Sequence, residues 1–478
     1  MNRVGTLVCR DGLDAAVLAE LSGDTVLAED LCDRVGAIQD LVNGAERLVL
    51  VLHDTRFSRA SLQADVRAAG IDPLGVQILD ASAFMIPSRV APILAGARAR
   101  AAAFTGSGPE HAKPVFDSLL SRRSLFAIPA PAYVAAPAIA TEACAAADGC
   151  RMCVTTCPQD AYRWLEGRVA YDKDACEPCG RCVTACPTGA IESPAVTPDG
   201  IRAQIEAIAT AAGAPVGIVF SCSRGQVAAM PDDWYSVTVP CTGMLDASWL
   251  CAPLLLGAAA VAALPCSATG CDRGNDDILV SSRSFALRMA AALGFTARMP
   301  EELTPLTSPP LAAFPVAAFS AGAAPEVFAA LRAATAGDVA VIAGPGSPVG
   351  MIAIDAETCT MCTMCSSICP TGALRHAYTD DELLTLSFDT GDCTACEQCL
   401  AVCPEIERDA IALEHRVDFN ALAEGRVILN EAATLTCQRC GIPIAPVAMM
   451  DRIAGLLGDD QAVMAHLTSL CLNCRGSS

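Results

Sequence analysis

Short apolar runs alternate with amphipathic segments over the first 85 residues of the chain. The apolar runs predict β-strands, at residues 4–9, 24–32, 47–54 and 75–81. The amphipathic segments between them predict α-helices, at residues 14–21, 33–42 and 58–70. Because strands that alternate with helices usually form parallel sheets, residues 1–85 are expected to be a small parallel α/β domain.

The pattern is less regular further along the chain. Residues 86–140 are rich in Ala and Pro and predict a linker with one or two helices. A helix is expected near 200–213, and strand–helix alternation over 215–300 predicts a second α/β domain. Residues 301–350 are rich in Pro, Ala and Thr and predict another linker around one helix. The longest apolar run, 250–264, is too short to span a bilayer.

Charge and cysteine content narrow the class of protein. The chain carries 32 Lys and Arg against 53 Asp and Glu, and its net charge of −21 argues against nucleic acid or an anionic membrane as partner. It holds 27 cysteines, and residues 1–10 do not resemble a signal peptide. In a reducing compartment, many thiols at C-x-x-C spacing indicate metal binding. We therefore expect a cytoplasmic metal-binding protein without membrane insertion.

Four cysteine runs carry the strongest chemical signal, in two pairs about 210 residues apart. Three of them follow C-x2-C-x2-C-x3-C-P, with Cys176, Cys179, Cys182 and Cys186, with Cys359, Cys362, Cys365 and Cys369, and with Cys393, Cys396, Cys399 and Cys403. The fourth run holds Cys144, Cys150, Cys153 and Cys157. A [4Fe-4S] cluster needs four converging thiolates, and in two-cluster proteins the cysteine before proline ligates the other run's cluster. The runs therefore predict two double-cluster modules, at residues 141–195 and 351–415.

Both modules resemble bacterial ferredoxins with two [4Fe-4S] clusters, down to CPTGAI at 186–191 and CPTGAL at 369–374. The resemblance implies four ligand sets: Cys359, Cys362, Cys365 and Cys403; Cys393, Cys396, Cys399 and Cys369; Cys176, Cys179, Cys182 and Cys157; and Cys150, Cys153, Cys186 and Cys144. The last set departs from the family pattern, because Ala147 stands at the expected first position and Cys144 lies three residues earlier. A three-cysteine site or a [3Fe-4S] cluster is the alternative there, and zinc is the alternative for the other three runs.

A middle block of cysteines comprises VGIVFSCSRG at 216–225, VPCTGMLD at 239–246 and LPCSATGC at 264–271. It resembles the small iron–sulfur protein that joins hydrogenases to heterodisulfide reductase and binds a [2Fe-2S] cluster. The resemblance implies one such cluster within residues 215–300, on Cys222, Cys241, Cys266 and Cys271. Cys251 lies in an apolar helical segment and is expected to be a core thiol. Buried structural cysteines throughout are the alternative.

The last block pairs CQRC at 437–440 with CLNC at 471–474. Two C-x2-C pairs form a tetrahedral four-sulfur site, which fits Zn²⁺ best and rubredoxin-type iron second. The sequence predicts a zinc-ribbon-like tail over 430–478, with Cys437, Cys440, Cys471 and Cys474 as ligands.

The first 80 residues resemble the N-terminal part of the flavin-binding subunit of heterodisulfide reductase, in GTLVCRDGLD, AEDLC and RLVLVLHDTRFSRASLQADVRAAGIDP. That family tends to carry a cysteine where this chain has His53, so a cluster on Cys9 and Cys32 is not expected. The family's flavin domain has no counterpart here. AGPGSPVG at 343–350 runs into a strand and predicts a turn, not a dinucleotide loop.

Several redox centres without a recognisable catalytic set describe an electron carrier, and we expect no catalytic residue. The fold class is α/β and α+β multidomain. The first hypothesis is an electron-transfer subunit of a larger oxidoreductase, whose partner is a molybdenum or tungsten enzyme such as a formate dehydrogenase, or a hydrogenase-like or flavin enzyme. The alternatives are a maturation or scaffold protein for such an enzyme, or a catalytic subunit with an atypical cluster.

Overall fold

The computed structural model describes residues 3–475 except 22–24, 30, 33–35, 43, 54–57, 116–130, 226–229, 266–274, 380–382, 458–463 and 465–467. The chain is a mixed α/β protein with several small sheets, divided into two compact units. Unit 1 comprises Met1–Cys144, Cys153–Arg163 and Val169–Asp338, and unit 2 comprises Ala145–Met152, Trp164–Arg168 and Val339–Ser478. Among the described residues, no helix combines the length and the apolarity that a membrane crossing requires.

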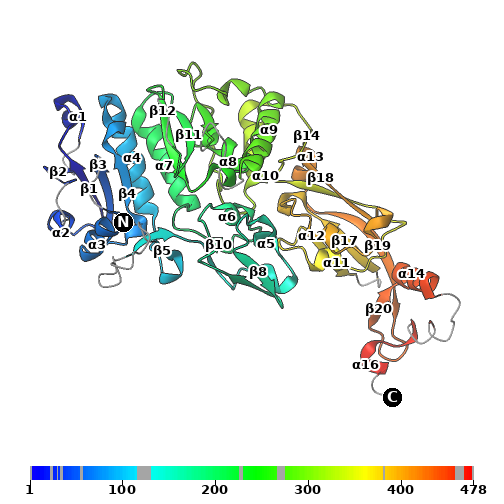
Figure 1. The fold of residues 1–478 in the computed structure, drawn as a ribbon. Helices are drawn as coiled ribbons and strands as arrows, with labels where there is room; N and C mark the ends of the chain where they lie inside the picture. The colour runs from blue at the N-terminus through cyan, green and yellow to red at the C-terminus, as the bar shows by residue number, and fades with distance from the viewer. Residues whose placement is uncertain are drawn as a thin grey trace, which may run out of the picture. The chain divides into compact units, whose positions relative to one another are not determined.

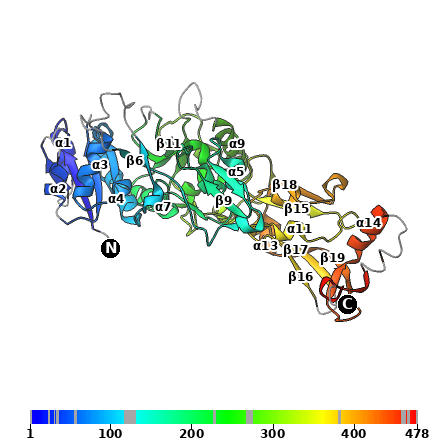
Figure 2. The same ribbon diagram turned by 60° about the horizontal axis from the view of Figure 1, so that its bottom comes forward.

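Unit 1 begins with a parallel four-stranded sheet of order β2-β1-β3-β4, formed by β1 (Val4–Cys9), β2 (Thr25–Ala28), β3 (Arg47–Leu52) and β4 (Gln77–Asp80). Successive residues of a strand point to opposite faces, so Leu48 and Leu50 pack on one face of β3 and Val49 and Val51 on the other. Helices cover both faces, as Figures 1 and 2 show: α1 (Ala15–Glu20), α2 (Ala37–Leu41), α3 (Arg59–Ala68) and α4 (Pro87–Ala103).

Within residues 86–140, for which the sequence predicts a linker with one or two helices, the structure contains the 17-residue helix α4. Val90 and Leu94 of α4 lie in the core on one face of the first sheet. The helix also packs along α7 (Pro198–Ala212), where a Cβ at Gly96 would lie 2.7 Å from Ile208. Glycine permits this close approach, and α4 thereby joins the first sheet to the middle domain.

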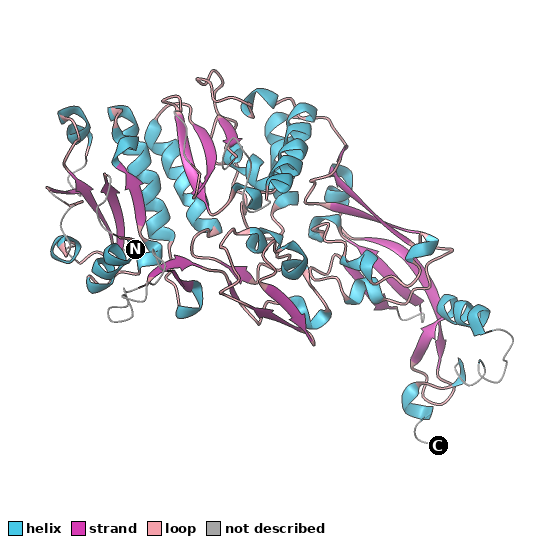
Figure 3. Ribbon diagram, viewed as in Figure 1, coloured by secondary structure: helices cyan, strands magenta, loops and turns pink. Residues whose placement is uncertain are grey.

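The middle domain is a three-stranded parallel sheet of order β12-β11-β13, with β11 (Gly217–Cys222), β12 (Trp234–Val239) and β13 (Ala260–Ala263). Every residue of β11 is buried, as expected for a strand covered on both faces. Figure 3 shows the flanking helices α7, α8 (Ala247–Cys251), α9 (Asp276–Ala292) and α10 (Ala324–Thr335). The rings of Phe328 in α10 and Phe285 in α9 lie 6.0 Å apart, so the one helix expected between 301 and 350 belongs to this core.

Short elements carry the first pair of cysteine runs: β7 (Ala138–Ile139), α5 (Met152–Thr156), β8 (Tyr162–Leu165), β9 (Arg168–Tyr171), α6 (Arg181–Ala185) and β10 (Ile191–Glu192). Strands β7 and β10 pair antiparallel, and β8 and β9 form a second two-stranded sheet. Another two-stranded sheet, within unit 1, pairs β5 (Ala112–Val115) with β6 (Ala132–Ala135).

Two antiparallel sheets lie within the residues of unit 2 that the structure describes. One has the order β14-β18-β15, from β14 (Val341–Ala343), β15 (Gly350–Ile354) and β18 (Ile411–Asp418). The other has the order β16-β17-β19-β20, from β16 (Leu374–Tyr378), β17 (Leu383–Phe388), β19 (Val427–Thr436) and β20 (Pro443–Pro446). The helices among the described residues of this unit are α11 (Met364–Ser367), α12 (Gln398–Ala401), α13 (Phe419–Glu424), α14 (Val447–Leu457) and α16 (Leu472–Arg475).

The tail and the second cysteine module are continuous in this unit. Strand β19, which leads into the tail, pairs with β17, which lies between the two cysteine runs of the module. Helix α14 is tied to the module by an ion pair from Arg452 Nε to Glu405 Oε1, at 3.0 Å. The sequence pattern did not predict the strands β16, β17, β19 and β20.

Candidate redox and metal centres

Cys359, Cys362, Cys365 and Cys403 surround one pocket of about 430 Å³, part of it open to solvent. Met361 and Thr363 have positive φ angles of 54° and 64°, a conformation uncommon for residues other than glycine. These two residues wind the backbone round the pocket so that three thiols of one run face it. The rest of the lining is mostly apolar, with Ile354, Leu386, Ala410 and Ile411.

A second pocket of unit 2, of about 330 Å³, is lined by Cys369, Cys393, Cys396 and Cys399. The same backbone device recurs, because Ala395 and Glu397 have positive φ angles of 50° and 59° at the positions equivalent to Met361 and Thr363. Strand β15 approaches closely at Gly350, where a Cβ would lie 3.2 Å from Cys393 Sγ. Burial raises the pKa of Cys365, Cys393 and Cys399 to about 12. Binding of a metal cluster would therefore displace protons from these thiols.

Cys157, Cys176, Cys179 and Cys182 line a pocket of about 320 Å³ in unit 1. Two donors point at its sulfurs: the backbone N–H of Ala161 donates to Cys157 Sγ, and the hydroxyl of Tyr162 to Cys182 Sγ, each at 3.4 Å. Burial, followed by the negative charge that Cys182 would carry, raises the pKa of Tyr162, so its hydroxyl keeps its proton. The role of Tyr162 as a hydrogen-bond donor was not predicted from the sequence, although Tyr162 follows Cys157 by only five residues.

The fourth predicted ligand set is the least regular. Cys153 and Cys186 are buried in one hydrophobic cluster, and Cys144 packs against it. A short 3₁₀ turn at Ala145–Asp148 follows Cys144, and the N–H of Cys150 donates to the carbonyl of Ala145 at 3.1 Å. The assignment of Cys144 and Cys150 as ligands stays a prediction.

In the middle domain, Cys222 ends β11 and Cys241 follows β12, so both lie at the carboxyl edge of the parallel sheet. Both thiols are buried. Contact with the Cys222 thiol, followed by burial, raises the pKa of Cys241. Cys251 is buried in α8, as predicted for a core thiol. Cys266 and Cys271 lie outside the described residues, and their role stays a prediction.

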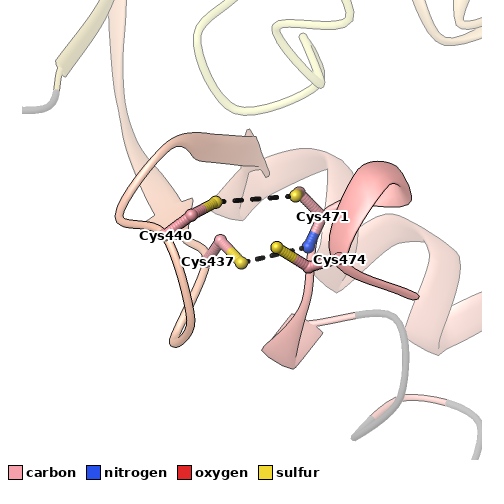
Figure 4. Close-up of side chains that lie close together, drawn as sticks. All are labelled: Cys437, Cys440, Cys471 and Cys474. Carbon is pink, nitrogen blue, oxygen red and sulfur yellow. Dashed lines mark hydrogen bonds between the residues drawn. The ribbon is translucent and has the colours of Figure 1, made fainter. Parts of the chain in front are cut away.

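The four cysteines of the tail point toward one another (Figure 4). Their sulfur atoms all lie within 4.8 Å of one another, and within the described part of the chain no other group of three or more Cys, His, Asp or Glu residues does this. Four thiolates placed tetrahedrally about 2.3 Å from one zinc ion have sulfur–sulfur distances of about 3.8 Å. The Sγ atoms of Cys440 and Cys471 are 3.7 Å apart, a spacing that fits a single ion and not a four-iron cluster.

Hydrogen bonding in the tail favours a thiolate. The backbone N–H of Cys471 donates to Cys437 Sγ at 3.4 Å and, as the largest of several such bonds, lowers the pKa of Cys437 to about 6. The neighbouring thiols of Cys440 and Cys471 raise the pKa of Cys474 to about 12. The thiolate of Cys437 can bind a divalent cation first. The bound cation would then offset the repulsion among the other thiolates, so that these lose their protons as well.

Cys9 and Cys32, for which no cluster is expected, are buried at the carboxyl edge of the first sheet. Burial, followed by a hydrogen bond with Cys9, raises the pKa of Cys32 to about 12. Cys32 Sγ accepts the backbone N–H of His53 at 3.2 Å.

Residues 143–190 and 358–406 match the family model of the 4Fe-4S dicluster domain. The two ranges contain all sixteen cysteines of the four runs. No curated protein matches the chain. The matches indicate two domains that bind [4Fe-4S] clusters, and they support an electron-transfer role with these clusters as carriers.

Proposed function

We propose that the protein is an electron-transfer subunit of a larger oxidoreductase, which relays electrons between a redox enzyme and a second carrier. The observation that carries this proposal is that three separate pockets are each lined by four cysteine thiols from two runs. Several such centres in one chain suit stepwise electron transfer, because burial and hydrogen bonds to sulfur can set each potential separately.

The proposed cofactor complement is four [4Fe-4S] clusters, one [2Fe-2S] cluster and one zinc ion. The [4Fe-4S] ligands are the sixteen cysteines of the four runs, in the sets that the ferredoxin resemblance implies. The [2Fe-2S] ligands are Cys222, Cys241, Cys266 and Cys271, and the zinc ligands are Cys437, Cys440, Cys471 and Cys474. The buried positions of Cys222 and Cys241 at one sheet edge support the [2Fe-2S] site. The sulfur spacing in the tail supports the zinc site.

The proposed partner is a molybdenum, tungsten, hydrogenase-like or flavin enzyme, such as a formate dehydrogenase. The net charge of −21 supports docking to a basic surface of that enzyme, since opposite charges steer association. Anaerobic co-purification from the native cells tests the proposal. We expect a stable complex in which the partner's substrate reduces the iron–sulfur centres reversibly. A complex that forms only with the cofactor-free enzyme would instead identify a maturation protein.

A further inference from the structure

Within unit 1, residues beside the cysteines of the first module lie against the turn that follows Cys241 of the middle domain. Gly180 and Arg181 line the pocket of Cys157, Cys176, Cys179 and Cys182. Gly180 has a φ of 82°, and a Cβ there would lie 2.6 Å from Met244 Sδ. Met244 ends the 3₁₀ turn Thr242–Met244, which starts immediately after Cys241. The positive φ favours glycine at this position, and the missing side chain leaves room for Met244 beside Cys179.

Asn275 connects the two sites through hydrogen bonds. Its side chain is buried, its Nδ2 donates to Cys241 Sγ at 3.4 Å, and its Oδ1 accepts from Arg181 Nη1 at 2.9 Å. A guanidinium can only donate, so the amide oxygen has to face Arg181 and the amide nitrogen is left for the sulfur. The orientation of the amide group is therefore set by its two partners.

Asn275 stands at the N-cap position of α9, where an asparagine side chain normally accepts a backbone N–H of the first turn. Here the side chain makes no capping hydrogen bond, and it is hydrogen-bonded to Cys241 and Arg181 instead. Packing holds it in place, because a Cβ at Gly243 would lie 2.5 Å from both the Cβ and the carbonyl oxygen of Asn275. The backbone N–H of Gly243 donates to Cys241 Sγ as well, at 3.4 Å.

We propose that Asn275 and Arg181 form an electron-transfer junction between the first module's cluster site and the centre at Cys222 and Cys241, and that Asn275 sets the potential of that centre. The inference rests on the proposed function, which places an iron–sulfur centre on these two thiols. When bound, such centres exchange single electrons, one being oxidised as the other is reduced, and no proton or ligand is transferred. The Nδ2–H donor favours the more negative, reduced state and so raises the reduction potential.

The test uses the full-length holoprotein, purified anaerobically. Asn275→Asp keeps the shape and the acceptor for Arg181, removes the donor to Cys241 Sγ and places a negative charge beside it, and both changes disfavour the reduced state. A redox titration followed by electron paramagnetic resonance is expected to show a lower potential for the middle centre, with iron content unchanged. Ser282→Ala, at a second buried polar position of α9, is the matched control and should leave this potential unchanged.

In fully reduced wild-type protein, the middle centre and the neighbouring cluster should also show spin–spin splitting, since the two sites adjoin. Absence of this splitting, or an Asn275→Asp potential equal to that of wild type, would overturn the inference while leaving the proposed function intact. If wild-type protein holds the iron of both modules but shows no middle-centre signal, the proposed [2Fe-2S] site itself is wrong. Should the Asn275 variant lose iron, Arg181→Gln is the second variant. Arg181→Gln should lower the reduction potential of the middle centre, because it removes a positive charge. An unchanged potential in this variant would rule out the proposed junction.

Discussion

At the scale of single residues, hydrogen-bond donors aimed at cysteine sulfur recur at the pockets of both modules. The N–H of Ala161 donates to Cys157 Sγ, and that of Leu374 to Cys369 Sγ, each at 3.4 Å. Both acceptors are the cysteines that precede proline. Such donors stabilise added negative charge on a cluster, so they are the means by which the chain can separate the potentials of similar sites.

Tyr162 offers a direct test of this role. Tyr162→Phe removes the hydroxyl donor to Cys182 Sγ and keeps the ring packed on Tyr171, 4.9 Å away. A donor that contributes about 1 kcal/mol more to the reduced state raises a one-electron potential by about 40 mV. The potential of this cluster should therefore fall by about that amount in a redox titration, with iron content retained. Tyr378→Phe, at an exposed position of β16, is the control, and an equal shift in both variants would contradict the role of Tyr162.

At the scale of elements, the close approach of β15 to the second module predicts a steric effect. Gly350→Val adds a branched side chain at a position where even a Cβ would lie 3.2 Å from Cys393 Sγ and 3.3 Å from Ala395. Because valine favours β-strands, a loss of iron could not be explained by a lower strand propensity of the variant. We expect the variant to bind less iron, through the site of Cys369, Cys393, Cys396 and Cys399, as measured by iron assay. Ala353→Val, at an exposed position of the same strand, should bind the wild-type amount.

The tail predicts a separate response to ligand loss. Cys440→Ser removes one of four thiols that lie within 4.8 Å of one another, and a structural zinc site stabilises its fold directly. The variant should lose its zinc and become more susceptible to proteolysis over 430–478, while the iron–sulfur absorbance survives. Metal analysis of purified protein measures both metals. A variant that keeps its zinc and loses iron instead would identify the tail as a rubredoxin-like site.

The elements that could be predicted from the sequence are those with a regular local signal. The runs at β1 and β3 are apolar and bounded by polar residues. The resemblance of the cysteine runs to two-cluster ferredoxins implies the sets of four thiols that line three of the pockets. The bounds of α4, which is one of the helices expected within residues 86–140, could not be predicted because Pro92 lies inside it and its composition resembles a linker. Asn275 could not be found either. An asparagine before a helical segment predicts a cap, and its bonds to Cys241 and Arg181 join residues 34 and 94 positions away.

At the scale of the whole molecule, neither compact unit is made of one cysteine module alone. Unit 1 combines the first sheet, most of the first module and the middle domain. Helix α4 packs on the first sheet through Leu94 and on α7 of the middle domain through Gly96. Unit 2 combines the second module with the tail through β17 and β19. Fragments cut at the predicted domain boundaries would therefore expose packed apolar surface, so cofactor content is best measured on the full chain.

The metal content of the full chain is the last prediction. Four [4Fe-4S] clusters contribute about sixteen irons and one [2Fe-2S] cluster about two more, so protein purified anaerobically should assay near eighteen. Cys241→Ser should remove about two of these irons, because it takes one ligand from the middle centre, and Cys251→Ser should remove none, because Cys251 is buried in α8. Iron and acid-labile sulfide, measured per chain with wild type in parallel, decide the outcome. A fully occupied wild-type protein with about eight irons or fewer would rule out two double-cluster modules. Equal losses in the two cysteine variants would show that the decrease comes from general destabilisation of the middle domain.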